Sequence, residues 1–534
     1  MVSEQQPVDK AEPPGWQKLL AVVAPFLTTL ALRLYLLPTT RTPFDSDEAL
    51  FLLIARHILR GERPLFFYGE NYGGTLDSYI TAIFFGLFGD SIALARLVQA
   101  GLYLLGMLFT YLLARRLLPG SRFGPLAALW LLAVPPLLLT NWTHPAVRYA
   151  VVFTLGSLIL YLGHRLLQED ANRLGVWLLF GAVCGLAFWT FGILATYMLP
   201  VFLLLLRNFK ARRLPLVIAA AVMFFLFSVA WWLQLLDGLR VLYNPDNPAQ
   251  LPPFLMRVFA FFALMLTAFF GIREPAGIQP VWPLLSALVL VFYMAAILYA
   301  IPYFRRKDPR SPATDSTGFA MLGLQVILWL IFFFATRFSL DATGRYITPL
   351  YPALAIAVGL ALERLARQKR ALGVGVLAAL LAFNLAVHLN ATWREPSGIT
   401  AQMNPSLMFG NDYDQELIDF VAAQGGRGYS HHWISYKIAY LSDEQVILAS
   451  FLPYSPNLTW SQRDHRYEPY AAVVTQADDR VFVIHHQPRL ERYLEQALAE
   501  KNIAFLIKDI GPYRVYYDLS AIITPQEMGW TNSP

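Results

Sequence analysis

A short polar segment near the N-terminus holds the densest group of residues that could carry out chemistry. Asp45, Asp47 and Glu48 place three carboxylates within four positions, directly before an apolar helical run. A carboxylate can remove a proton from a hydroxyl group, and several carboxylates together can hold a divalent metal ion. The simpler alternative is that Ser46 or Asp47 caps a helix over Glu48–Arg60, where the helix dipole favours acidic residues. Capping needs one such residue, so three favour a catalytic or metal-binding role.

A second polar stretch follows within the same segment. Five of its side chains are candidate ligands of a substrate: Tyr68, Glu70, Asn71, Tyr72 and Asp77. Tyrosine and asparagine offer hydrogen bonds and stacking surfaces of the kind that suits sugars, and the glycines between them permit tight turns. The alternative is an ordinary interfacial turn with a belt of tyrosines.

Two later segments carry cationic side chains beside long apolar runs. His144 and Arg148 lie in one of them, where the alternative is anchoring at a membrane interface. Arg345 and Tyr346 lead directly into another apolar run, and a guanidinium group suits the two-pronged binding of a phosphate. For Arg345 the alternative is an ion pair with Asp341. We take His144, Arg148, Arg345 and Tyr346 as candidate substrate-binding residues.

Two histidine doublets, His431-His432 and His485-His486, have the composition of metal ligands. In a strand, neighbouring side chains face opposite sides of the sheet. We therefore do not expect these doublets to bind a metal ion.

The elements that must position these residues are mostly apolar. Apolar residues make up 56% of the 534 residues, charged residues make up 15%, and the mean hydropathy is +0.46. A soluble globular chain carries about 45–50% apolar and about 25% charged residues. The composition excludes a water-soluble enzyme, a disordered protein and a coiled coil. The single cysteine, Cys184, excludes disulfides within the chain and a cysteine-based zinc site.

Apolar blocks long enough to cross a membrane follow one another along the chain. A crossing needs about 20 mostly apolar residues. The candidates are Leu19–Leu37, Leu97–Ala114, Gly124–Asn141, Arg148–Gly163, Leu174–Leu206 (two short crossings with a corner at 189–192), Leu214–Leu236, Pro275–Phe304, Ser316–Thr336, Tyr346–Leu362 and Ala371–Trp393. Ile80–Phe88 and Phe254–Gly271 are interpreted as helices that lie at, or dip into, the outer face. Placing the basic clusters in the cytoplasm then predicts about 11 crossings, a cytoplasmic N-terminus and an outer C-terminus.

Composition also divides the chain into parts. Residues 1–16 are interpreted as a disordered cytoplasmic N-terminus, residues 17–393 as the membrane domain with its first outer loop at 38–75, and residues 394–534 as an extracytoplasmic α/β domain. In the last part the pattern predicts helices at Asp414–Gln424 and Pro488–Lys501, strands at Gln445–Ala449, Arg480–His485 and Ile503–Asp509, and an edge strand at Tyr513–Asp518. No glycine-rich phosphate loop opens any of these helices.

Two stretches, Asp47–Gly74 and Arg345–Pro352, resemble motifs of the membrane glycosyltransferases of the GT-C fold. More narrowly they are similar to the family 39 group, which takes in dolichyl-phosphate-mannose protein mannosyltransferases and bacterial aminoarabinose transferases. The resemblance covers residues 17–390. It implies a GT-C-like polytopic helical fold, a polyprenyl-phosphate sugar as donor and a reaction on the outer membrane face.

The resemblance also implies roles for particular residues. The family's first-loop acidic pair is catalytic, which points to Asp47 and Glu48, with Asp47 preferred as the base and Asp45 as a third carboxylate. Arg345 would contact the donor phosphate. Relatives often carry an aspartate between the third and fourth crossings, where this sequence offers His144 and Arg148 instead.

These observations predict an integral membrane glycosyltransferase that transfers a hexosyl or pentosyl group from a polyprenyl-phosphate donor to an acceptor hydroxyl on a glycan, lipid or protein. A divalent metal ion held by Asp45, Asp47 and Glu48 is the candidate cofactor, and no nucleic-acid partner is expected. The alternative is a transporter or flippase for a lipid-linked glycan, which would place ionisable residues at mid-membrane. A membrane scaffold that presents the outer domain would leave the acidic loop unexplained.

Overall fold

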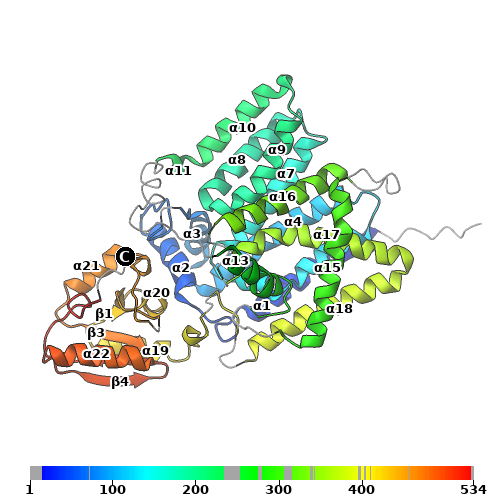
Figure 1. The fold of residues 1–534 in the computed structure, drawn as a ribbon. Coiled ribbons are helices and arrows are strands. Elements are labelled where there is room, and N and C mark those ends of the chain that lie inside the picture. Colours follow the sequence, from blue (N-terminus) through cyan, green and yellow to red (C-terminus); the bar gives the residue numbers. More distant parts are fainter. Residues whose placement is uncertain are drawn as a thin grey trace, which may run out of the picture.

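The chain folds into a large helical body followed by a small α/β domain that lies against one end of that body (Figure 1). The computed structural model describes residues 15–70, 72–233, 253–274, 280–305, 315–336, 341, 343–394, 398–401, 404–408, 410–455 and 457–530.

Seven helices of this described part are long and apolar enough to cross a membrane. They are α1 (Gly15–Leu36), α4 (Ile92–Leu117), α7 (Tyr149–Leu167), α15 (Pro283–Arg305), α16 (Ser316–Ala335), α17 (Tyr351–Gln368) with the preceding 3-10 turn η5 (Arg345–Leu350), and α18 (Arg370–Thr392). The chain is therefore a multi-pass membrane protein, as the sequence predicts.

Other predicted crossings are shorter or broken helices. Helices α5 (Phe123–Ala133) and α6 (Leu137–Thr143) are bent by 63° relative to each other, as in a broken span or a re-entrant loop. The bend falls at Pro135-Pro136, because proline lacks the N–H that would continue the helical ladder. Helices α8 (Leu174–Thr190), α9 (Ala195–Arg207) and α10 (Leu214–Phe227) complete the series. The corner predicted at 189–192 is confirmed by the break between α8 and α9.

The two apolar stretches predicted not to span are short helices. The first is α3 (Leu76–Phe88), and the second runs through α13 (Phe254–Ala260), a π-helical turn η3 (Phe261–Met265) and α14 (Leu266–Phe269). Helix α11 (Val229–Leu233) follows α10.

Small residues let α8 and α10 approach closely. A methyl group at Gly181 would lie 2.1 Å from the carbonyl oxygen of Ala220, and one at Gly185 would lie 2.5 Å from that of Phe224. Such close backbone contact is the usual reason for glycine on a packed membrane helix. Beside this contact the three helices α8, α9 and α10 enclose an apolar cleft of about 500 Å³.

The α/β domain is built on a five-stranded sheet of order β2-β1-β3-β5-β4. Its strands are β1 (Arg427–Ser430), β2 (Ile447–Ser450), β3 (Val481–His485), β4 (Leu506–Ile510) and β5 (Tyr513–Tyr517). Strand β1 runs parallel to β2 and β3, whereas β5 pairs antiparallel with β3 and β4. The helices are α19 (Asp414–Ala423), α20 (His432–Leu441), α21 (Glu468–Thr475) and α22 (Pro488–Glu500).

Two predictions about this sheet are wrong. The sequence does not reveal β1, a four-residue strand that contains Gly428, and it places β5 at an edge. The edge strand beside β5 is instead β4, whose first four residues are exposed. Strand β5 lies inside the sheet because the β4–β5 hairpin folds back onto β3.

Candidate functional site

The site begins at the N-terminus of α2 (Ser46–Leu59), where the chain leaves α1. Asp45 is the N-cap, and its Oδ1 accepts a hydrogen bond of 3.0 Å from the backbone N–H of Glu48. The prediction that Ser46 or Asp47 caps this helix is therefore wrong by one or two positions, because the extended backbone already ends at Asp45. The other oxygen of Asp45 accepts from Thr400 at 2.5 Å. Burial, with the nearby charge of Asp47, raises the pKa of Asp45 to about 6.

Glu48 points into the helical body and away from Asp47. Its two carboxylate oxygens accept from Nε and Nη2 of Arg96 on α4, at 3.0 and 2.6 Å. The backbone N–H of Ala146 adds a third bond of 3.2 Å, and both side chains of the ion pair are fully buried. This carboxylate therefore ties the loop after α1 to α4 and to the chain before α7. Within the described residues no three carboxylate, histidine or cysteine side chains converge as a metal site would require.

Asp47 is the acidic side chain that faces the α/β domain. Nε2 of His432, the first residue of α20, donates to its Oδ1 over 3.1 Å. The Asp47 side chain is 30% exposed, whereas that of His432 is buried. Burial works to raise the pKa of Asp47, but the hydrogen bond and charge of His432, with the charges of Arg466 and Arg345, lower it below its usual range.

Glu70 joins two cations from opposite sides of the site. It lies 3.5 Å from Nη1 of Arg148 and 3.2 Å from Nη1 of Arg466. Arg148 belongs to the membrane domain and Arg466 to the α/β domain. The carboxylate of Glu70 therefore links a cation of one domain to a cation of the other.

Arg148 is held in an unusual conformation at the start of α7. Its backbone has a φ of 75°, in the left-handed region that costs a non-glycine residue free energy. Its guanidinium carbon lies 5.2–5.3 Å from the ring centroids of Phe51, Phe67 and Phe191. Gly73 makes room for it, because a methyl group there would lie 2.5 Å from Nη1.

A buried carboxylate accompanies this arginine. Asp77 is 1% exposed, and neither of its oxygens has a hydrogen-bond partner among the described side chains and backbone. Burial raises the pKa of Asp77 to about 6, and the charge of Arg148 opposes that rise.

Arg345 opens η5 beside the same cluster. Its Nε donates to Asp341 over 2.6 Å, so the pairing considered as an alternative from the sequence is present. The pair engages one edge of the guanidinium group, and the Arg345 side chain remains 34% exposed. The group lies over the rings of Trp142 and Tyr346, at 5.7 and 5.0 Å.

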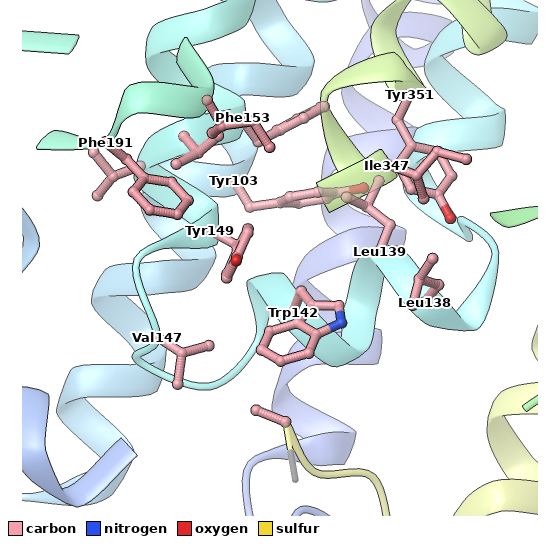
Figure 2. Close-up of a cluster of buried hydrophobic side chains, with 14 of the residues drawn as sticks. Tyr103, Leu138, Leu139, Trp142, Val147, Tyr149, Phe153, Phe191, Ile347 and Tyr351 are labelled. Carbon is pink, nitrogen blue, oxygen red and sulfur yellow. The ribbon is translucent and has the colours of Figure 1, made fainter. Parts of the chain in front are cut away.

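Aromatic side chains form the floor of this region. Figure 2 shows Trp142, Tyr149 and Phe191 gathered around the turn between α6 and α7. The ring centroids of Trp142 and Tyr149 are 5.0 Å apart, and those of Tyr149 and Phe191 are 6.2 Å apart. Tyr346 stacks on Phe191 at 6.5 Å. The cations therefore stand over an apolar, aromatic layer.

Six of the sequence-predicted residues come together here: Asp47, Glu70, Tyr72, Arg148, Arg345 and Tyr346. Tyr72 is half-exposed, and Glu70, Arg466, Arg148 and Arg345 act on it electrostatically.

The other predicted substrate-binding residues lie apart from this group or beneath it. Tyr68 donates to Glu62 over 2.5 Å and its ring packs on that of Tyr467 with centroids 4.5 Å apart, so it belongs to the contact with the α/β domain. His144 is buried against the carbonyl of Leu36. Asp77 lies beneath the cluster near Arg148. Asn71 lies outside the described residues.

Sequence reasoning misses the residues that the α/β domain contributes. The sequence places the His431-His432 doublet in a strand, whereas His432 opens a helix after β1. Arg466 lies in an irregular segment before α21, with no local pattern that marks it. Only the packing of α20 on α2 brings these residues to Asp47.

The helical body with its α/β domain has the GT-C fold, which solved structures of membrane glycosyltransferases share. The sequence profile of the family described as dolichyl-phosphate-mannose-protein mannosyltransferase matches residues 75–232.

Solved structures extend this likeness to nearly the whole chain. The apo crystal structure of ArnT from Cupriavidus metallidurans has a TM-score of 0.61 at 15% identity, covering 94% of this chain and 97% of ArnT. Its complex with undecaprenyl phosphate has a TM-score of 0.58 at 16% identity, covering 95% and 98%. The mycobacterial arabinofuranosyltransferase AftD has a TM-score of 0.52 at 13% identity, covering 96% of this chain but 40% of AftD. Comparison with curated proteins found no match.

Proposed function

We propose that the protein transfers a sugar from a polyprenyl-phosphate donor to an acceptor hydroxyl at the outer face of the membrane. The single observation that carries this proposal is one partly exposed carboxylate, Asp47, which His432 holds from behind and on which the charges of Arg345 and Arg466 act. Glycosyl transfer from a lipid phosphate needs a base for the acceptor and a cationic site for the leaving group. The undecaprenyl phosphate bound by ArnT supports the donor class.

Asp47 is the proposed general base. Its Oδ1 is occupied by His432, and within the described part of the chain Oδ2 has no hydrogen-bond partner. Oδ2 takes the proton of the acceptor hydroxyl as the acceptor oxygen attacks the anomeric carbon. The bond from that carbon to the phosphate oxygen breaks, polyprenyl phosphate leaves, and the configuration at the anomeric carbon inverts.

Arg345 and Arg148 are the proposed phosphate ligands. Arg345 keeps part of its guanidinium edge exposed, and Arg148 stands over three aromatic rings that exclude water. In such surroundings a cation stabilises developing negative charge more than it would in water. Tyr72 and Tyr346, beside the same cations, are placed to contact the sugar.

The apolar cleft between α8, α9 and α10 suits an isoprenoid chain. Phe188 lines it, and Phe188 lies one helical turn before Phe191, which contacts Arg148. A donor with its phosphate at Arg148 could therefore lay its tail along α8. This arrangement supports a lipid-linked donor over a nucleotide sugar.

The test is release of polyprenyl phosphate by purified protein incubated with a panel of polyprenyl-phosphate hexoses and pentoses, with and without acceptor glycans, lipids or peptides. EDTA added to parallel samples tests whether a divalent metal ion bound by the acidic loop takes part. We expect release with one donor, and a loss of about 10²–10⁴-fold in Asp47→Asn, the usual contribution of a general base. Wild-type release by that variant would remove Asp47 from the role of base.

A further inference from the structure

The outer α/β domain reaches into the membrane-domain site through one residue in particular. His432 supplies the hydrogen bond that Asp47 receives among the described residues, and the two are 385 positions apart in the chain. Because His432 is buried while Asp47 is partly exposed, the histidine stands behind the carboxylate as seen from solvent.

The histidine is fixed rigidly by its own helix. Helix α20 packs on α2, and the backbone N–H of Lys437 donates to Oγ of Ser46 over 3.1 Å. Phe44 and Tyr440 pack with ring centroids 5.3 Å apart on the same contact. The ring of His432 is further held edge-on against its neighbours in α20.

Lys437 anchors α20 within its own domain. Its Nζ lies 2.9 Å from Asp414 and donates to Tyr513 over 2.7 Å, and all three side chains are buried. The position of His432 relative to Asp47 therefore depends on the fold of the whole outer domain.

We infer that His432 is the positioning residue for Asp47: its Nε2–H holds one carboxylate oxygen so that the other is presented to the acceptor hydroxyl. The inference rests on the proposed function, and it makes the outer domain an integral part of the active site. The contact resembles the histidine–carboxylate pairs of hydrolytic enzymes with the roles exchanged, since here the histidine orients the carboxylate.

The charge of His432 also acts on Asp47. The groups that act on Asp47 are His432, the guanidinium groups of Arg466 and Arg345, the carboxylates of Asp45 and Asp464, and the hydroxyl of Tyr454. Removing the histidine takes away the hydrogen bond and the electrostatic interaction that lower the pKa of Asp47, and leaves the two arginines to oppose the acidic groups. The carboxylate of Asp47 then binds its proton at higher pH, so the acidic limb of the pH–rate profile moves upward.

The chain offers a matched set of variants. His432→Ala removes both the hydrogen bond and the charge, whereas His432→Gln keeps an N–H near the position of Nε2. The control is His431→Gln. The ring of His431 is buried like that of His432, but it pairs with His485 at 2.8 Å, inside the outer domain.

We expect His432→Ala to lower kcat on the order of 10²-fold, the cost of a misplaced catalytic group, with little change in KM for the donor. His432→Gln should recover most of kcat, and both variants should shift the acidic limb upward. His431→Gln should keep the wild-type kcat and profile. A double-mutant cycle of Asp47→Asn and His432→Ala, measured as shifts in thermal unfolding, should show that the two changes are not additive.

Each alternative result separates this inference from the proposed function. If Asp47→Asn is inactive while both His432 variants keep wild-type kcat and pH profile, the inference fails and the proposed function stands. Additive unfolding shifts, or a loss of kcat without movement of the acidic limb, would reduce His432 to a structural role. If no polyprenyl-phosphate sugar is turned over, the proposed function fails. The double-mutant cycle measured by thermal unfolding still decides whether Asp47 and His432 interact.

Discussion

The neighbours Asp47 and Glu48 should respond to substitution in opposite ways. Glu48 and Arg96 form a buried ion pair with two direct bonds, and Glu48 also accepts from Ala146. Glu48→Gln leaves the Arg96 cation buried without its counter-charge, which costs about 3–5 kcal/mol in comparable pairs. The pair of Asp47 with His432 is partly exposed, so Asp47→Asn should cost at most about 1 kcal/mol of stability.

The two variants are compared by unfolding in detergent–SDS mixtures and by turnover per folded molecule. Glu48→Gln should unfold at markedly lower SDS yet keep turnover within a few-fold of wild type, whereas Asp47→Asn should unfold like wild type and lose turnover. Glu48→Met combined with Arg96→Met should recover part of the lost stability, because no charge remains buried.

A stable, inactive Glu48→Gln would refute this reasoning and return Glu48 to the catalytic role that the sequence resemblance implies. Equal losses of stability in both variants would show that Asp47 is no less structural than its neighbour.

Three further outcomes are expected. Arg345→Lys keeps the positive charge but loses the planar guanidinium group, so KM for the donor should rise while stability is unchanged. Arg345→Ala should raise KM further. An unchanged KM in both variants would exclude a contact between Arg345 and the donor phosphate. Gly73→Ala should weaken donor use because its methyl group displaces Arg148, whereas Gly192→Ala, with nothing within 4 Å, should behave as wild type in the same assay. Burial acts to raise the pKa of Glu444, but its contacts with histidine and arginine outweigh burial and lower the pKa from 4.5 to about 2. The contribution of Glu444 to stability is therefore complete above pH 4.5 and is lost as the pH falls toward 2. Across that range the unfolding temperature should fall less in Glu444→Gln than in the wild type.

The contact between α2 and the α/β domain explains the pH dependence expected for Glu444. Glu444, after α20, accepts from His57 and Tyr470, both at 2.9 Å, and pairs with Arg60. Tyr467 donates to Glu62 over 2.6 Å on the same surface. The loop that carries Asp47 is therefore stabilised by the domain that carries His432.

Much of the fold follows from local pattern. Runs of about 20 apolar residues predict membrane helices because lipid cannot satisfy backbone hydrogen bonds. The helices predicted at Asp414–Gln424 and Pro488–Lys501 are confirmed as α19 and α22. The sequence does not predict β1, because four residues that include a glycine give too little periodicity. It does not predict the position of β5, because strand order depends on pairing between distant segments.

By itself the sequence determined that the protein spans a membrane many times and that acidic and cationic residues cluster near the ends of its helices. Hydropathy and residue type are properties of each segment, so they can be read without knowing its neighbours. Only the tertiary structure assigned Glu48 to Arg96, made Asp45 the helix cap, and brought His432 and Arg466 to Asp47. These assignments depend on which helix packs on which, and the free energy of that packing is spread over contacts between residues hundreds of positions apart.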